Sequence, residues 1–164
     1  MVMNIKKNVI LALLTTTALI LSYVESLIPF FMGIPGMKLG LANLAVVFCL
    51  YHLGIKEAGL LNFMRICLSG LLFGNMFSIL FSLCGAIVSF LAMVLCKKLR
   101  FSIYGVSISG GVFHNIGQLF VAIFIVQNVS ISIYGPFLLI SGLITGGLIG
   151  YISKLFLGYM EKIE

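Results

Sequence analysis

The sequence contains no aspartate, and four glutamates supply all of its side-chain carboxylates. This shortage excludes several kinds of catalytic site. A Ser-His-Asp triad needs aspartate, and an acid-rich cage for magnesium needs several carboxylates close together. The chain also lacks the GxxxxGK[ST] loop through which many ATPases bind phosphate. We therefore expect a protein that is not an enzyme.

Charge of either sign is scarce. Charged residues make up 9% of the 164 residues and hydrophobic residues 62%, against about 25% and about 45–50% in soluble domains. No long polar stretch could fold by itself, so residues 1–164 are expected to form a single transmembrane domain. The net charge of +6 is explained better by membrane topology than by nucleic acid, for which no motif is present.

Metal-binding patterns are also missing. The four cysteines stand singly in apolar runs without CxxC spacing, and His114 has no second His, Cys or Asp near it in the sequence. Cysteines in such surroundings are typical packing residues. We predict no metal site and no cofactor.

Six apolar segments could cross a bilayer, for which about 20 residues are needed. Gly74-Asn75 and the basic segment Lys97 to Arg100 mark two of the breaks between them. The first segment lacks an Ala-x-Ala cleavage pattern, so we interpret it as a retained helix and not a signal peptide. The sequence predicts an all-α, polytopic membrane protein with helices at residues 8–30, 39–54, 57–74, 75–96, 104–127 and 133–158.

Basic residues predict the orientation, because cytoplasmic loops are enriched in Lys and Arg. With the N-terminus inside, Lys38 is the one basic residue outside, and Arg65 lies within the third helix. Eight basic residues then face the cytoplasm, which places both termini there: Lys6, Lys7, Lys56, Lys97, Lys98, Arg100, Lys154 and Lys162.

Small residues recur at four-residue spacing. Gly142, Gly146 and Gly150 follow this pattern in the sixth segment, and Ala12-x-x-x-Thr16 and Ala18-x-x-x-Ser22 follow it in the first. Such spacing lets helix backbones approach closely in a membrane. It indicates either packing within the bundle or docking onto a partner subunit.

Polar residues inside a membrane cost free energy and usually face a cavity or a partner. Arg65 lies near mid-membrane, where either Glu25 or an anionic ligand could balance its charge. His114 and Gln118 are spaced i, i+4 and share a helix face, beside Asn115. They could line a cavity or simply hydrogen-bond neighbouring helices.

The segment around Lys38 raises a similar choice. Gly36 and Gly40 flank this lysine at the expected start of the second helix, and Asn43 lies one turn into that helix. A lysine beside free N–H groups at a helix start favours an anion. The alternative is that Lys38 anchors the loop at the lipid headgroups.

The order of these motifs resembles the Gx transporter family, also catalogued as heptaprenyl diphosphate synthase component I. The resemblance covers nearly the whole chain. It is carried by Glu25-Ser-Leu-Ile-Pro29, Pro35-Gly-Met-Lys-Leu-Gly-Leu-Ala-Asn43, Arg65 with Leu68-Ser-Gly-Leu-Leu-Phe-Gly74, Gly105-Val-Ser and His114-Asn-x-x-Gln118.

That family is similar to the S-components of energy-coupling factor (ECF) importers, six-helix membrane proteins that bind a micronutrient from outside. The resemblance implies a bacterial cell-membrane protein that works with a coupling subunit and ATPases. It gives Ala12, Thr16 and Ala18 a possible docking role. An alternative is a non-catalytic membrane subunit for prenyl diphosphate or quinone synthesis, or for flavin-based electron transfer.

We expect the ligand to be a small anionic or zwitterionic molecule, because cationic side chains predominate among the candidates. The predicted substrate-binding residues are Glu25, Lys38, Asn43, Arg65, His114, Asn115 and Gln118.

Overall fold

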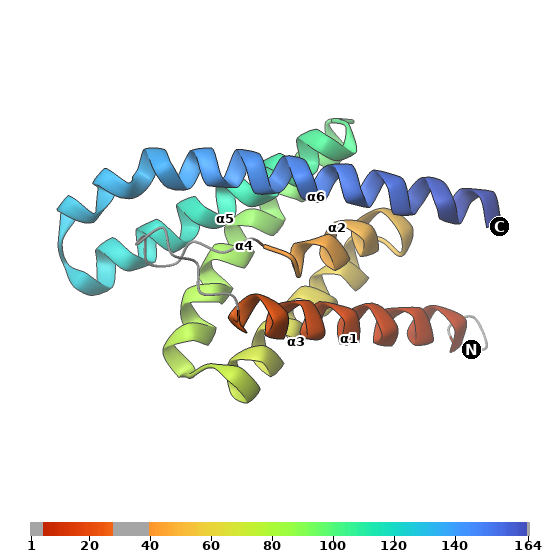
Figure 1. Cartoon of the computed structure of the whole chain (residues 1–164), viewed down its shortest axis with the longest axis horizontal. Helices are drawn as coiled ribbons and strands as arrows, with labels where there is room; N and C mark the ends of the chain where they lie inside the picture. Colours follow the sequence, from red (N-terminus) through yellow and green to blue (C-terminus); the bar gives the residue numbers. More distant parts are fainter. Residues whose placement is uncertain (1–4, 28–39, 164) are drawn as a thin grey trace.

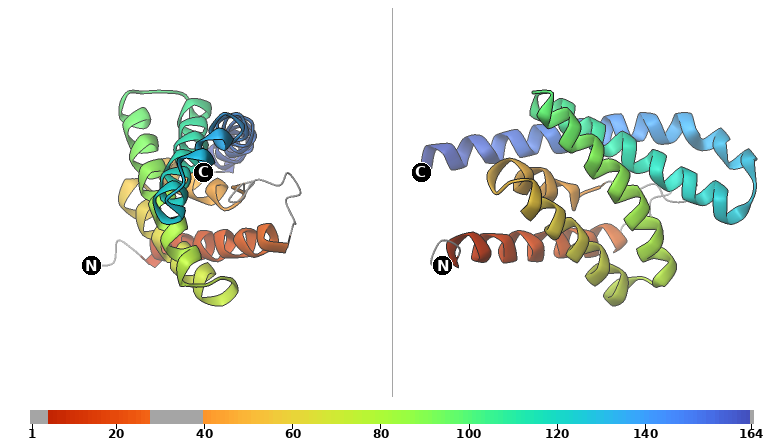
Figure 2. Two further views of the ribbon diagram at one scale, coloured as in Figure 1. Left: turned by 90° about the vertical axis from the view of Figure 1, so that its left-hand side faces the viewer. Right: turned by 180° about the vertical axis from the view of Figure 1, so that it is seen from behind.

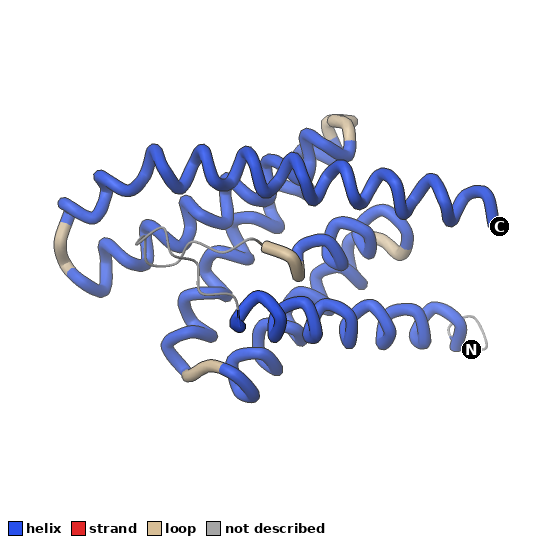
Figure 3. The backbone as a smooth tube through the Cα atoms, in the orientation of Figure 1, coloured by secondary structure: helices blue, strands red, loops and turns tan. Residues whose placement is uncertain are grey.

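The protein is helical apart from short connections in the part of the chain that is described, residues 5–27 and 40–163 of a computed structural model. No strand occurs within these ranges (Figure 3). The all-α prediction is therefore confirmed. In chain order the helices are α1 (Ile5–Leu27), α2 (Asn43–His52), α3 (Ile55–Phe73), α4 (Met76–Lys98), α5 (Ile103–Val126), the 3-10 helix η1 (Val129–Tyr134) and α6 (Gly135–Ile163).

The helices form two groups, which are joined by α2 and by packing of α3 against α4. Helix α5 packs most extensively against α4 and α6, while α1 packs against α3. Short helix α2 contacts α1 and α3 on one side and α6 on the other (Figures 1 and 2). The start of α1 and the end of α6 lie at the same end of the molecule (Figure 1). The apolar core is therefore centred on α2, whose Val46, Val47 and Leu50 are fully buried.

Four segments are long and apolar enough to cross a membrane, within the described ranges: Ile5–Leu27, Met76–Lys98, Ile103–Val126 and Val129–Met160. Helix α2 has only ten residues, and α3 contains Lys56, Glu57 and Arg65. The protein is thus a multi-pass membrane protein. Large apolar side chains exposed along these helices, such as Leu91 and Phe124, suit contact with lipid.

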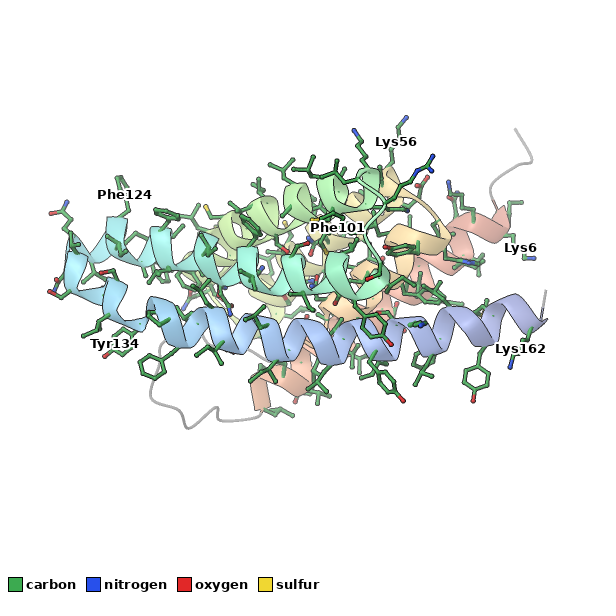
Figure 4. The ribbon with its side chains drawn as sticks, turned by 90° about the horizontal axis from the view of Figure 1, so that it is seen from above. Lys6, Lys56, Phe101, Phe124, Tyr134 and Lys162 are labelled. Carbon is green, nitrogen blue, oxygen red and sulfur yellow. The ribbon has the colours of Figure 1, made fainter. Side chains whose placement is uncertain are left out.

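The two ends of the molecule differ in chemistry. Lys6 and Lys162 lie at one end, Lys56 lies in the same half of the molecule, and Phe124 and Tyr134 lie toward the other end (Figure 4). We call the first the basic end. There the Lys7 ammonium donates a hydrogen bond to the Glu57 carboxylate at 2.5 Å, which ties α1 to the start of α3.

The glycine ladder of α6 packs against α5. A Cβ atom added at Gly142 or Gly146 would lie 2.8 or 2.7 Å from a backbone Cα of α5. One added at Gly150 would lie 3.1 Å from the Cα of Tyr104. Only glycine permits so close an approach of two backbones. The ladder therefore packs helices within the bundle.

The second helix begins later than the sequence predicted. Asn43 is the first residue of α2, whereas the sequence pattern predicts that it lies one turn inside a helix that starts at residue 39. Gly40 has a φ of +71°, and its carbonyl accepts the Asn43 N–H at 2.8 Å in a turn. This left-handed conformation is incompatible with a right-handed helix, so the helix starts only after the turn.

The predicted turn between the third and fourth helices is confirmed. Asn75 caps α4, because its side-chain oxygen accepts the Ser78 N–H at 2.8 Å. At the other end of α4, the Lys97 ammonium donates to the Leu50 carbonyl and lies 4.7 Å from the centre of the Tyr51 ring. Lys97 thereby satisfies a carbonyl in the last turn of α2.

Candidate functional site

A cavity lined largely by polar side chains lies inside the bundle, and every α-helix contributes to its wall. We call it the polar cavity; its volume is about 50 Å³. That is room for water or for a few ligand atoms. The described residues that line it are Glu25, Gly40, Ala42, Asn43, Asn62, Arg65, Ser82, Ser89, Gly111, His114, Asn115, Thr145 and Ile149.

Five of the residues expected to bind substrate meet in this cavity. They come from four helices and are far apart in the sequence: Glu25, Asn43, Arg65, His114 and Asn115. Periodicity alone could not bring residues of α1, α3 and α5 to one cavity, so this convergence comes from the tertiary fold. A shared cavity is the arrangement that a small-molecule site requires.

A second cavity of about 120 Å³ adjoins the first. Glu25, Arg65 and Ser82 line both spaces. The second is also lined by the hydroxyls of four other serines: Ser22, Ser26, Ser69 and Ser78. Glu25 and Arg65 therefore lie where the two cavities meet, and each cavity provides further hydrogen-bonding side chains near them.

Arg65 is the cationic centre of the polar cavity. Its side chain is partly buried, and one terminal nitrogen donates to Asn62 Oδ1 at 2.7 Å. The Nε atom is buried and has no hydrogen-bond partner among the described residues. An unsatisfied buried N–H costs about 1–3 kcal/mol. A carboxylate or phosphate could satisfy the guanidinium in a bidentate pair, so the site is suited to an anion.

Glu25 supplies the opposite charge. Its carboxylate accepts the backbone N–H of Gly40 at 2.5 Å, linking the end of α1 to the turn before α2. The carboxylate also attracts the Arg65 guanidinium electrostatically. The cavity thus presents a cation and an anion together, a combination that suits a zwitterion.

The polar residues of α5 divide between different surroundings. His114 lines the polar cavity. Asn115 also reaches it, but its side-chain nitrogen donates to the Leu138 carbonyl of α6 at 2.7 Å. Gln118 does not line the polar cavity and instead lines a separate apolar one. His114 and Gln118, which we expect on one face of the helix, therefore line two different cavities.

The remaining predicted residues lie elsewhere. Lys38 falls outside the described residues. Ala18 is fully buried in the core, whereas Ala12 and Thr16 are exposed on α1. The Thr16 hydroxyl donates to the Ala12 carbonyl at 3.0 Å within the helix.

Sequence reasoning missed four polar residues of the wall: Asn62, Ser82, Ser89 and Thr145. Asn62 precedes Arg65 by three residues, a spacing that places both on one helix face and could have revealed it. The hydroxyls are harder to foresee, because serine and threonine often bond to nearby carbonyls in helices. Thr145 does this, donating to the Ser141 carbonyl at 2.9 Å.

Within the described ranges, no three His, Cys, Asp or Glu side chains are grouped so that they could hold an ion. The groups present can bind and orient a ligand through hydrogen bonds and charge.

Comparison with known proteins gives one match. Searches of curated proteins and of solved structures found no similar protein. The profile of a family described as heptaprenyl diphosphate synthase component I matches residues 14–156, most of the chain and all the helices that form the cavity. The chain therefore belongs to the heptaprenyl diphosphate synthase component I family.

Proposed function

We propose that this protein is the substrate-binding subunit of an ECF-type micronutrient importer and captures a small anionic or zwitterionic ligand from outside the cell. The observation that carries the proposal is the buried Nε of Arg65, which has no partner in the described structure although it lies beside Glu25 in a polar cavity. A ligand carboxylate or phosphate would complete its hydrogen bonding.

The proposed topology has six crossings with both termini in the cytoplasm. Support comes from Lys6 and Lys162, which lie at the basic end with the start of α1 and the end of α6, and from Lys56 in the same half of the molecule (Figures 1 and 4). Cytoplasmic segments are rich in such residues. In this arrangement α2 crosses the membrane largely shielded by its neighbours, which accommodates its ten residues. Helix α3 presents exposed apolar side chains such as Leu71 to lipid and carries Arg65 in the wall of the polar cavity.

A binding subunit without an ATPase motif needs partners to drive transport. We propose a membrane coupling subunit and ATPases, with no enzymatic activity and no cofactor in this chain. Ala12 and Thr16 are exposed and lie one helical turn apart on α1, so this strip could contact a partner helix closely. Ala18 cannot take part without leaving the core.

The test uses the two arginines of the chain. The full-length protein and its Arg65→Gln and Arg100→Gln variants are purified in mild detergent, and retained small molecules are identified by mass spectrometry. Arg100 is exposed and does not line the polar cavity, so it is the matched control. Circular dichroism and the melting temperature establish folding.

We expect an anionic or zwitterionic molecule in the wild type and in Arg100→Gln, and a loss of at least tenfold in Arg65→Gln. Losing a charge-assisted hydrogen bond, at about 1.5–3 kcal/mol, gives roughly this factor. A wild-type protein that retains no such molecule, or equal retention in both variants, would refute the proposal. Purification with a coupling subunit and ATPases would support the importer role.

The family description favours a second candidate, a non-catalytic membrane subunit associated with prenyl diphosphate synthesis. The polar residues would then hold the helices together. This candidate predicts that the tagged protein copurifies with a long-chain prenyl synthase, and that the synthase works faster with it than without it. Copurification with a coupling subunit alone would count against it.

A further inference from the structure

A large apolar cavity lies between α4, α5, η1 and the start of α6, away from the polar cavity. Its volume is about 340 Å³, and it shares no lining residue with the polar cavity. We call it the aromatic cavity. It is lined by Phe77, Phe81, Gln118, Leu119, Ala122, Ile125, Val126, Ile131, Tyr134 and Leu138. None of these described lining residues is charged.

Gln118 is the polar exception in this wall. The residue is only 3% exposed, and its side-chain nitrogen is buried without an acceptor in the described part of the chain. Its position is fixed by close packing, because a Cβ added at Gly85 would lie 2.8 Å from Gln118 Cγ. A buried amide donor that lacks an acceptor costs free energy, which a ligand oxygen would recover.

The rings around the cavity favour a flat ligand. Phe77 and Phe81 are nearly parallel, with ring centres 6.1 Å apart and planes at 18°. Tyr134 lines the same space from η1. Aromatic walls of this kind stabilise another ring through offset stacking or edge contacts. The ligand should therefore combine a planar ring with a hydrogen-bond acceptor.

The aromatic cavity borders the outer surface of the bundle. Phe77 and Val126, which line it, are more than half exposed at the outer surface of the bundle, at 53% and 59%. A membrane-soluble molecule could reach the cavity laterally, with any apolar tail remaining in the bilayer. A phospholipid fits less well, because its phosphate would find no cation among the lining residues.

We propose that the aromatic cavity binds a lipid-soluble ring ketone of the quinone class, whose ring packs among Phe77, Phe81 and Tyr134. Its carbonyl oxygen accepts a hydrogen bond from Gln118 Nε2 after the side-chain amide rotates and brings this buried nitrogen to the cavity surface. This site is independent of the ligand proposed for Arg65. Only binding is assigned, and the ring keeps its oxidation state.

Decyl-benzoquinone is a suitable probe, with decylcyclohexane as the ligand that keeps the tail but lacks the carbonyls. The chain has six tyrosines and no tryptophan, so its ultraviolet emission is tyrosine emission. Quenching of that emission by the quinone, corrected for absorbance, reports binding near the tyrosines, of which Tyr134 lines the cavity. The full-length protein is titrated in detergent micelles, and quenching of free tyrosine in the same micelles is subtracted.

Three variants test the assignment. Gln118→Leu keeps the volume but removes the donor and should weaken quinone binding about fivefold to tenfold, the value of one neutral hydrogen bond. Its melting temperature should stay unchanged or rise, because an unsatisfied buried donor is lost. Ala122→Phe should fill the cavity and abolish saturable quenching. Arg65→Gln should bind the quinone as the wild type does.

Several results would overturn the inference. These are unsaturable quenching in the wild type, equal affinity for quinone in wild type and Gln118→Leu, or displacement of the quinone by decylcyclohexane at equal concentration. Displacement by phosphatidylglycerol would identify the cavity as a site for ordinary membrane lipid instead. Because Arg65→Gln separates the two sites, failure here leaves the proposed function standing, and the reverse also holds.

Discussion

The packing of α6 against α5 predicts opposite behaviour for two adjacent glycines. Replacing Gly146 by alanine would place a Cβ atom 2.7 Å from the Ile108 Cα and 2.8 Å from the Ser107 carbonyl oxygen. At Gly147, no described atom lies within 4 Å of the added carbon. Both changes add one methyl group to the same helix, so Gly147→Ala is a matched control.

The magnitude follows from the contacts. Ordinary van der Waals contact begins at 3.4 Å, so the Gly146→Ala helices must separate by about 0.7 Å, the difference between 3.4 and 2.7. The atoms in the way belong to the α5 backbone and cannot rotate aside. Overpacking of this kind typically costs about 1–3 kcal/mol. Gly147→Ala should be neutral or stabilise by up to about 1 kcal/mol, because alanine has the higher helix propensity.

The assay is reversible unfolding in mixed micelles, with dodecyl sulfate as denaturant and far-ultraviolet circular dichroism as the signal. We expect the midpoint of Gly146→Ala to fall and that of Gly147→Ala to stay or rise. Equal midpoints for the two variants would show that α5 and α6 do not pack through this glycine ladder. A lower midpoint for Gly147→Ala alone would reverse the assignment of the packed face.

Two further predictions concern polar contacts. Asn115→Ala removes the 2.7 Å bond to the Leu138 carbonyl and should lower the unfolding free energy by about 1–2 kcal/mol, measured in the same micelles; no change would mean that the bond does not brace α6. The hydrogen bond from Lys7 lowers the pKa of Glu57 below its usual 4.5. The Lys7–Glu57 pair therefore stabilises the folded protein above pH 4.5, and this contribution is lost as the pH falls through the lowered pKa of the folded state. Glu57→Gln should remove this part of the pH dependence of the unfolding free energy. For so exposed a pair the effect should be below about 1 kcal/mol. A variant whose unfolding free energy depends on pH as that of the wild type does would contradict the prediction.

Much of the fold follows from hydropathy and turn residues alone. The Gly74-Asn75 turn could be predicted because the Asn75 side chain caps the next helix locally. The start of α2 could not, because it depends on Gly40 adopting a positive φ while its N–H bonds to Glu25, fifteen residues earlier. Interactions that depend on the tertiary fold leave no periodic signal in the chain.

The candidate site shows the same limit in the pair His114 and Gln118. Residues four apart are offset by only about 40° around a helix, so the sequence reasonably placed both on one face. Gly85 of α4 packs against that face at both residues. A Cβ there would lie 2.8 Å from Gln118 Cγ and 3.2 Å from His114 Cε1. The close approach of α4 leaves His114 in the polar cavity and Gln118 in the aromatic one. A glycine in a different helix therefore decides which polar residues act together, and only the packed structure reveals it.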